Sequence, residues 1–103
     1  MKKYSIKFTE SAEEDILDLA VVINDKYKAP LTGKKYTTEL IIEIFKLKST
    51  AESIPFCSQI SVVAKYGYNA RRTNYKKMAI IYTVNENIVV IEAIIPQGNV
   101  KDL

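Results

Sequence analysis

The spacing of apolar residues divides the chain into segments of different period. Residues 4–8, YSIKF, alternate between apolar and polar, which predicts a half-buried β-strand. Over residues 9–29 the apolar residues recur every three or four positions, which predicts a helix with one buried stripe. Residues 31–55 repeat that spacing and predict a second helix. The two apolar stripes are Ala12, Ile16, Leu19, Ile23 and Tyr27, then Tyr36, Leu40, Ile44 and Leu47.

Polar residues and prolines mark the ends of these helices. Thr9 and Ser11 are both candidate N-caps of the first helix, and Ser11 with Glu14 matches a capping box. Pro30 disfavours helical conformation at the preceding residue, so the first helix is expected to end near Ala29. The link between the two helices is short, which predicts a helical hairpin.

After Pro55 the apolar period changes to two, which predicts strands separated by turns. A hairpin turn is expected at residues 85–87, where an asparagine can adopt the left-handed conformation. The last strand is apolar on both faces apart from Glu92, so a central position is expected for it. No strong structure is expected beyond Pro96. The predicted strands are residues 59–65, residues 70–84 as one bent strand or as two, and residues 88–95.

The order of these elements is β-α-α-β-β-β, and it determines the expected architecture. Short links between the late strands require antiparallel pairing. The apolar stripes of the helical hairpin must be buried, and the sheet is the surface available for this. We therefore expect an α+β fold of two layers, with the helical hairpin packed on a three- to four-stranded antiparallel sheet. A length of 103 residues suits a single domain spanning residues 1–103.

Charge is distributed unevenly along the chain, although the net charge is only +3. Acidic residues crowd the first predicted helix, whereas no acid occurs between Cys57 and Ala79. Such a separation favours a polarised molecule whose basic side could meet phosphates or an acidic partner. The cations of the acid-free segment are Lys65, Arg71, Arg72, Lys76 and Lys77.

Residue usage excludes several kinds of chemistry. The single cysteine, Cys57, excludes an intramolecular disulfide and a cysteine-based zinc site, and is expected to be a small core residue. The absence of histidine excludes histidine triads and histidine metal ligands. We expect no cofactor and no metal. Without a signal peptide or a membrane-spanning apolar run, a cytoplasmic protein is expected.

The chain resembles the RelE/ParE superfamily of type II toxin–antitoxin toxins, which includes bacterial plasmid stabilisation proteins. The segment YSIKFTESAEEDILDLA is similar to the first strand and helix of that superfamily, with Ala12 and Asp15 at the usual places. The segments MAIIYTV and IVVIEAII are similar to its core hairpin, with Tyr82 at the usual aromatic position. The resemblance covers nearly the whole chain and implies a growth-inhibiting toxin that is neutralised by a cognate antitoxin.

The superfamily divides by mechanism, and the basic residues favour one branch. RelE-like members cleave messenger RNA on the ribosome with Lys and Arg on the central strands and with Arg and Tyr near the C-terminus. Here Ala79 replaces an expected arginine, and the tail offers Gln97, Asn99 and Lys101 without Arg or Tyr. These departures favour a ParE-like inhibitor of DNA gyrase. The alternatives are a RelE-like, metal-independent endoribonuclease and an inert toxin-like interaction module.

The resemblance and the cation cluster together give candidate binding residues, while catalytic residues stay unassigned. In an extended segment Arg71 and Arg72 should face opposite sides, as should Lys76 and Lys77, and Arg72 is the preferred contact. The alternative interpretation is that these cations have no binding role and only keep an exposed strand edge solvated. The residues expected to bind the target or the antitoxin are Arg71, Arg72, Tyr75, Lys76, Lys77 and Lys101.

Acidic side chains and tyrosines receive structural interpretations. Glu92 is expected to pair with Arg71 or Arg72, and the acids Glu14 and Asp18 to lie in solvent. Tyrosines between the cations could stack on RNA bases. They are equally suited to a strand in which the ring packs and the hydroxyl contacts water.

The expected partners follow from the resemblance. They are a cognate antitoxin and either DNA gyrase or the ribosome with its messenger RNA, and a homodimer is a further possibility. The antitoxin should bring a partly acidic segment that folds on binding, either into a groove or as a strand added to the sheet. No association with a membrane is expected.

Overall fold

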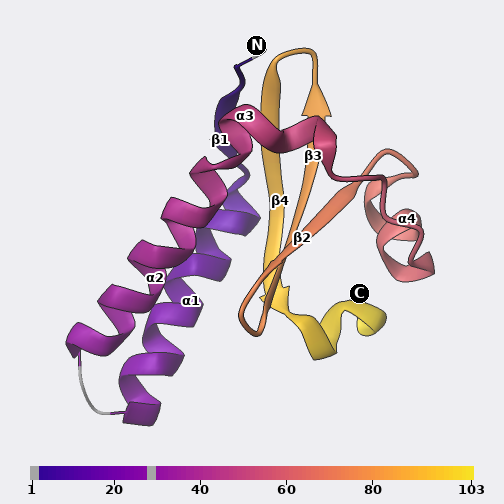
Figure 1. Cartoon of the computed structure of the whole chain (residues 1–103). Coiled ribbons are helices and arrows are strands. Elements are labelled where there is room, and N and C mark those ends of the chain that lie inside the picture. The colour runs from indigo at the N-terminus through magenta and orange to yellow at the C-terminus, as the bar shows by residue number, and fades with distance from the viewer. Residues whose placement is uncertain (1–2, 28–29) are drawn as a thin grey trace.

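The computed structural model describes residues 3–27 and 30–103, and Figure 1 shows its arrangement. Two long helices follow a short first strand, and three further strands follow a short helix. The expected order of strand, helix, helix and later strands is therefore confirmed, with extra short helices between. The elements are β1 (Ser5–Phe8), α1 (Glu10–Tyr27), α2 (Pro30–Phe45), α3 (Leu47–Thr50), the 3-10 helix η1 (Ala51–Ser53), α4 (Ile60–Tyr66), β2 (Arg71–Tyr75), β3 (Met78–Asn85), β4 (Ile88–Pro96) and the 3-10 helix η2 (Gln97–Asp102).

The four strands form one sheet in the order β1-β4-β3-β2, with β4 in a central position as expected. Antiparallel pairing joins β2 to β3 and β3 to β4. The sheet is mixed, however, because β1 pairs parallel with β4. The expectation of a wholly antiparallel sheet is thus corrected. Its basis was the short links among the late strands, whereas the long connection from β1 to β4 permits a parallel neighbour.

Both faces of the sheet are covered, as Figure 1 shows: α1 and α2 lie on one side, and α4 with the C-terminal segment on the other. The α1–α2 side holds the larger core, which includes the buried side chains of Leu40, Ile44, Ile80 and Ile91. A smaller core under α4 and η2 buries Val62, Ala70, Ala79, Ile81, Ala93 and Val100. The helical hairpin packs on one face of the sheet, as expected. The expected two-layer fold did not include α4 and η2 on the other face.

The start of α1 follows from its sequence. The backbone N–H of Ala12 donates to the Thr9 hydroxyl at 3.0 Å, so Thr9 is the N-cap. Ser11 already lies inside the helix, so the proposed capping box with Glu14 is wrong. Ala12 and Ile23 are buried as the stripe predicts. The expected helix end near Ala29 lies outside the described residues.

Two segments after α2 differ from expectation. Residues 59–65 were expected to form a strand because they are rich in β-branched residues, but Ile60–Tyr66 forms α4. There Val62 is fully buried against the sheet, so tertiary packing overrides local propensity. The tail is also structured, since Gln97–Asp102 forms η2 and buries Val100. The second predicted helix ends at Phe45 and continues only as the short α3 and η1.

Tight turns connect the last three strands. Lys76 has φ of 53° between β2 and β3, so residues 70–84 contain two strands rather than one bent strand. Glu86 has φ of 57° in the β3–β4 turn, so the left-handed residue of the expected hairpin turn is Glu86 and not an asparagine. Across the described residues, no helix has the length and apolar character needed to cross a bilayer.

Candidate functional site

The structure places Arg71 and Arg72 on opposite faces of β2, as their alternation predicts. Arg71 lies on the α1–α2 side, where its guanidinium donates to the carbonyl oxygen of Ile54. A second, longer bond of 3.4 Å reaches the Glu52 carbonyl, and the guanidinium carbon lies 4.3 Å from the centre of the Phe56 ring. Arg71 therefore braces the segment between η1 and α4, and its charge is largely engaged inside the protein.

Because of these contacts, the substitution Arg71→Ala is expected to lower the free energy of unfolding by about 2 kcal/mol. The change removes a charge-assisted bond to the Ile54 carbonyl and the stacking on Phe56. Denaturant unfolding of the purified protein measures it. Lys35→Ala, which removes an exposed cation from α2, is the control and should change stability by less than about 0.5 kcal/mol. Equal losses in both variants would contradict the bracing role.

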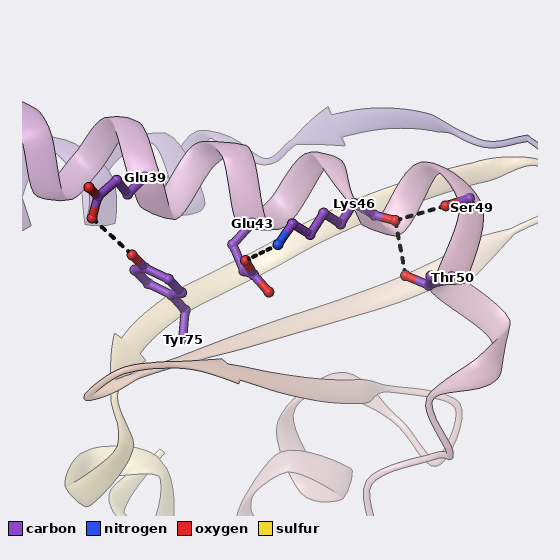
Figure 2. A network of polar contacts seen from close by, with 6 residues as sticks. All are labelled: Glu39, Glu43, Lys46, Ser49, Thr50 and Tyr75. Atoms are coloured by element: carbon purple, nitrogen blue, oxygen red, sulfur yellow. Dashed lines mark hydrogen bonds and ion pairs between the residues drawn. The ribbon is translucent and has the colours of Figure 1, made fainter.

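Lys76 and Tyr75 belong to a cluster that joins the β2–β3 turn to α2. The Tyr75 hydroxyl donates to the Glu39 carboxylate at 3.1 Å, as Figure 2 shows. The Lys76 ammonium lies 3.6 Å from the same carboxylate and 5.4 Å from the ring centres of both Tyr36 and Tyr75. Tyr75 and then Glu39 raise the pKa of Lys76, so its charge is firmly retained. Since Lys76 lies in a turn, the expectation that Lys76 and Lys77 alternate along a strand is wrong.

Further polar contacts fix the end of α2 near this cluster. Glu43 and Lys46 form an ion pair of 3.0 Å one turn beyond Glu39 (Figure 2). The carbonyl oxygen of Lys46, just before α3, accepts bonds from the hydroxyls of Ser49 and Thr50, the last two residues of that short helix. These contacts hold the backbone where α2 gives way to α3.

Arg72 lies on the other face of the sheet, beside α4. Its guanidinium donates to the Gln59 side-chain oxygen at 2.8 Å and to the Asn74 side-chain oxygen at 3.0 Å. Gln59 also lines a shallow pocket of about 500 Å³ together with Ile60, Ser61 and Lys101. We call Arg72, Gln59, Ile60 and Lys101 the Arg72–Lys101 surface. It joins two of the predicted binding residues that are far apart in the sequence.

This surface combines charge with an exposed apolar side chain. Ile60 is 84% exposed and lines the same pocket as Gln59 and Lys101. The bond from the Ser61 hydroxyl to the Val100 carbonyl, 2.6 Å long, holds α4 against η2. Sequence reasoning missed Gln59 and Ile60, because it placed both in a strand. Lys77 is exposed in the β2–β3 turn, and its carbonyl oxygen accepts the N–H of Gln97 at 2.8 Å.

The central strands present apolar side chains to α4 and η2. The strands β3 and β4 contain no lysine or arginine. Their side chains on this face are apolar and covered, including Ala79, Ile81 and Ala93. Cleavage of RNA without histidine needs cations around the phosphate and a group that accepts the 2′-hydroxyl proton. On the central strands no side chain offers a positive charge for the first of these tasks.

One buried tyrosine and two partly buried acids have structural partners. Tyr82 is fully buried, its hydroxyl donates to the Ala51 carbonyl at 2.7 Å, and burial raises its pKa to about 12. The Asp15 carboxylate accepts the Ile94 N–H at 2.9 Å and so ties α1 to β4, while burial raises its pKa. Glu92 accepts the Thr83 hydroxyl at 3.0 Å. Its expected pairing with Arg71 or Arg72 is wrong, because both arginines bind elsewhere.

The interpretations of Cys57 and of the two acids on α1 agree with the structure. Cys57 is half-buried and packs against the core beneath α4. Glu14 and Asp18 are exposed on α1. Within residues 3–27 and 30–103, no three acidic or cysteine side chains lie close enough together to hold a metal ion.

Comparison of sequences finds no match, whereas comparison of structures finds chains with a similar fold. No protein-family model and no curated protein sequence matches the chain. A chain of the chromosomal ParDE toxin–antitoxin system from P. aeruginosa matches with a TM-score of 0.74 at 13% identity, over 93% of this chain and 98% of that one. A chain of the toxin–antitoxin complex RelBE2 from Mycobacterium tuberculosis matches with a TM-score of 0.62 at 13% identity, over 92% and 99%.

Both matches span nearly the full length of this chain, so the likeness concerns the whole arrangement of helices and strands. It includes the β3–β4 hairpin and the helical hairpin that the sequence predicted. At 13% identity the likeness establishes the fold alone. The chain has the fold of the RelE/ParE toxin superfamily.

Proposed function

We propose that the chain is the toxin of a type II toxin–antitoxin system, that it acts as a single domain over residues 1–103, and that it inhibits DNA gyrase in the manner of ParE-like toxins. A cognate antitoxin neutralises it. Two toxin–antitoxin systems supply the structural neighbours, and this supports the general role.

We choose gyrase inhibition over RNA cleavage because the central strands β3 and β4 carry no cations. A nuclease would need basic side chains facing a bound RNA, whereas β3 and β4 contain no lysine or arginine. The face beneath α4 and η2 is filled by apolar side chains such as Ile81 and Val100. A toxin that acts by binding needs no such groups. This arrangement therefore favours gyrase inhibition over RNA cleavage.

The Arg72–Lys101 surface is the proposed contact with the target. Arg72 and Lys101 supply positive charge, and Ile60 supplies exposed apolar area. Clustered cations speed the encounter with phosphate groups or with an acidic protein surface. Arg71, Tyr75 and Lys76 make internal contacts, so we assign them a supporting role. Exposed Lys77 stays a candidate for antitoxin or target binding.

The alternative is a ribosome-dependent endoribonuclease, and Arg72 with Lys101 is the observation in its favour. Two cations joined through Gln59 could hold a phosphate group. A third possibility is an inert interaction module. Induced expression separates the three.

Induced expression of this chain in bacterial cells is expected to stop growth and to trigger a DNA-damage response while transcripts stay intact. The physical reason is that stalled gyrase leaves broken DNA but does not touch RNA. Colony counts, a damage-responsive reporter and primer extension on messenger RNA are the measurements. Cleavage within codons would identify the nuclease instead, and normal growth with folded protein present would identify the inert module.

A control tests the antitoxin half of the proposal. Co-expression of the product of a neighbouring small open reading frame should restore growth, and the two proteins should co-purify. If no neighbouring product binds this chain, the toxin–antitoxin pairing is contradicted even where growth stops.

A further inference from the structure

We propose that the hollow between α1 and the end of β4 is a binding site for a small primary aliphatic amine, which it takes up as the ammonium ion. The proposal goes beyond the proposed function, because the site shares no residue with the Arg72–Lys101 surface and does not depend on toxicity. It rests on the size of the hollow, on its apolar walls and on the two aspartates that line it.

The hollow lies where β4 continues past the end of β1. The pairing with β1 covers residues 88–91 of β4, whereas β4 runs on to Pro96. Beyond Ile91, α1 takes the place of the missing strand, and its Asp15 carboxylate accepts the Ile94 N–H at 2.9 Å. A hollow of about 250 Å³ remains between the helix and the strands. Pockets for drug-sized ligands start at about 300 Å³, so this one suits a smaller molecule.

Apolar side chains from three elements form most of the walls. Leu19 and Val22 come from α1, Met78 from the start of β3 and Ile95 from β4. Val22 is 59% exposed, although it lies on a helix that packs against the sheet. Water in contact with such walls is released when an alkyl chain replaces it, which favours binding of the chain. The walls therefore specify an apolar body for the ligand.

Two carboxylates add negative charge to this apolar site. Asp15 and Asp18 are three residues apart on α1 and so share one face of the helix. Burial raises the pKa of Asp15, the charge of Asp18 raises it further, and Lys65 on α4 lowers it. Within residues 3–27 and 30–103, Asp15 forms its one hydrogen bond with the Ile94 N–H, and neither aspartate forms an ion pair. A partly buried carboxylate without a cation is unfavourable, so the site favours a cationic ligand.

Apolar walls and carboxylates together select an ammonium ion over other cations. A primary ammonium has three N–H donors, so it can bond to more than one carboxylate oxygen, and its alkyl chain is apolar. A hard metal ion needs six or more oxygen ligands, and the described residues offer no group of three acids or cysteines for one. The remaining walls supply no oxygen ligands from their side chains, since they are apolar. The site is therefore specific for an amine with an alkyl chain of several carbons.

Probes of matched length test the proposal on the purified, unaltered chain by NMR titration. Hexylammonium should bind at least about tenfold more tightly than hexanol or hexanoate, which have the same chain without the positive charge. Propylammonium should bind at least about tenfold more weakly than hexylammonium, because its shorter chain buries less apolar area. The amide signals that shift should be those of α1 from Asp15 to Val22 and those of Ile94 and Ile95.

A further probe separates a free amine from a lysine side chain of a partner protein. The amide of Nα-acetyl-lysine carries an ammonium on a chain that ends in hydrated peptide groups. We expect it to bind at least about tenfold more weakly than hexylammonium, since these groups cannot enter an apolar hollow without losing water. Equal or tighter binding of the lysine derivative would assign the site to a protein partner and overturn the proposal.

Amide substitutions supply the matched variants. Asp15→Asn with Asp18→Asn should weaken hexylammonium at least about tenfold and leave hexanol within about twofold. Asparagine keeps a side-chain oxygen for the Ile94 N–H, so the fold should persist. Glu10→Gln with Glu13→Gln removes the same charge from exposed positions in the first turn of α1 and should leave the affinity within about twofold, because distant charges are screened.

Several results would overturn the proposal. They are equal affinity for the ammonium and the alcohol, no saturable binding of hexylammonium, shifts confined to other parts of the chain, and equal losses in the two double variants. Growth inhibition is a separate readout, so failure here leaves the proposed toxin role untouched.

Discussion

Replacing Tyr82 with alanine is expected to lower the free energy of unfolding by about 4 kcal/mol. The side chain is fully buried and belongs to the core between the sheet and the helical hairpin. Its removal leaves a cavity that the surrounding strands cannot close. It also takes away the donor to the Ala51 carbonyl, which lies in the segment that leads to the Arg71 contacts. Denaturant unfolding followed by circular dichroism measures the loss.

Tyr82→Phe is the matched control, since it keeps the ring and deletes only the hydroxyl. It should cost about 1–2 kcal/mol, the usual penalty for a buried carbonyl that loses its donor. The difference between the two variants then measures the packing of the ring. If alanine destabilises no more than phenylalanine, the ring does not contribute to the core as the structure implies.

Replacing Arg72 with alanine is expected to reduce toxicity, or the affinity for the antitoxin, by about thirtyfold while leaving the fold intact. That factor corresponds to about 2 kcal/mol, the usual cost of truncating a central contact residue. Within the described part of the chain, the side chain forms its hydrogen bonds with Gln59 and Asn74, on the α4 side of the sheet. Loss of these contacts should lower stability by no more than about 1 kcal/mol. Survival of induced cells measures the first effect, and thermal unfolding measures the second.

Lys46→Ala serves as the comparison, because Lys46 is an exposed cation at the end of α2, on the other side of the sheet from Arg72, and its ammonium pairs with Glu43. It should change neither toxicity nor antitoxin binding. Should Arg72→Ala fold normally, kill as the parent does and bind the antitoxin as tightly, then Arg72 only solvates the strand edge, as the alternative interpretation holds.

The opposite roles assigned to Arg71 and Arg72 show how far sequence reasoning reaches. Their alternation predicted that they face opposite sides, and the structure confirms it. The pattern did not reveal which side holds an internal partner. Arg71 donates to Ile54, which is 17 positions away in the chain. A local sequence pattern cannot predict a partner so far away in the chain. The contact depends on how the segment after α2 crosses the end of the sheet.

The helix α4 shows a second limit of sequence reasoning, because here local preference predicted the wrong element. Its residues, ISVVAKY, are rich in β-branched side chains, and local preference favours a strand. The helix forms because Val62 fills the smaller core and because Ser61 bonds to the Val100 carbonyl. With α4 misassigned, Gln59 and Ile60 could not be recognised as neighbours of Arg72 and Lys101.

The sequence by itself determined the helical hairpin, the β3–β4 hairpin and the central position of β4, because each follows from apolar spacing within one segment. It also indicated the superfamily resemblance, which agrees with the fold. Only the tertiary structure decided that β1 joins the sheet in parallel, that α4 and η2 close the second face, and which cations are exposed. The physical reason is range: periodicity depends on neighbours a few residues apart, whereas the partner of a strand edge or a charge is set by segments that meet only after folding.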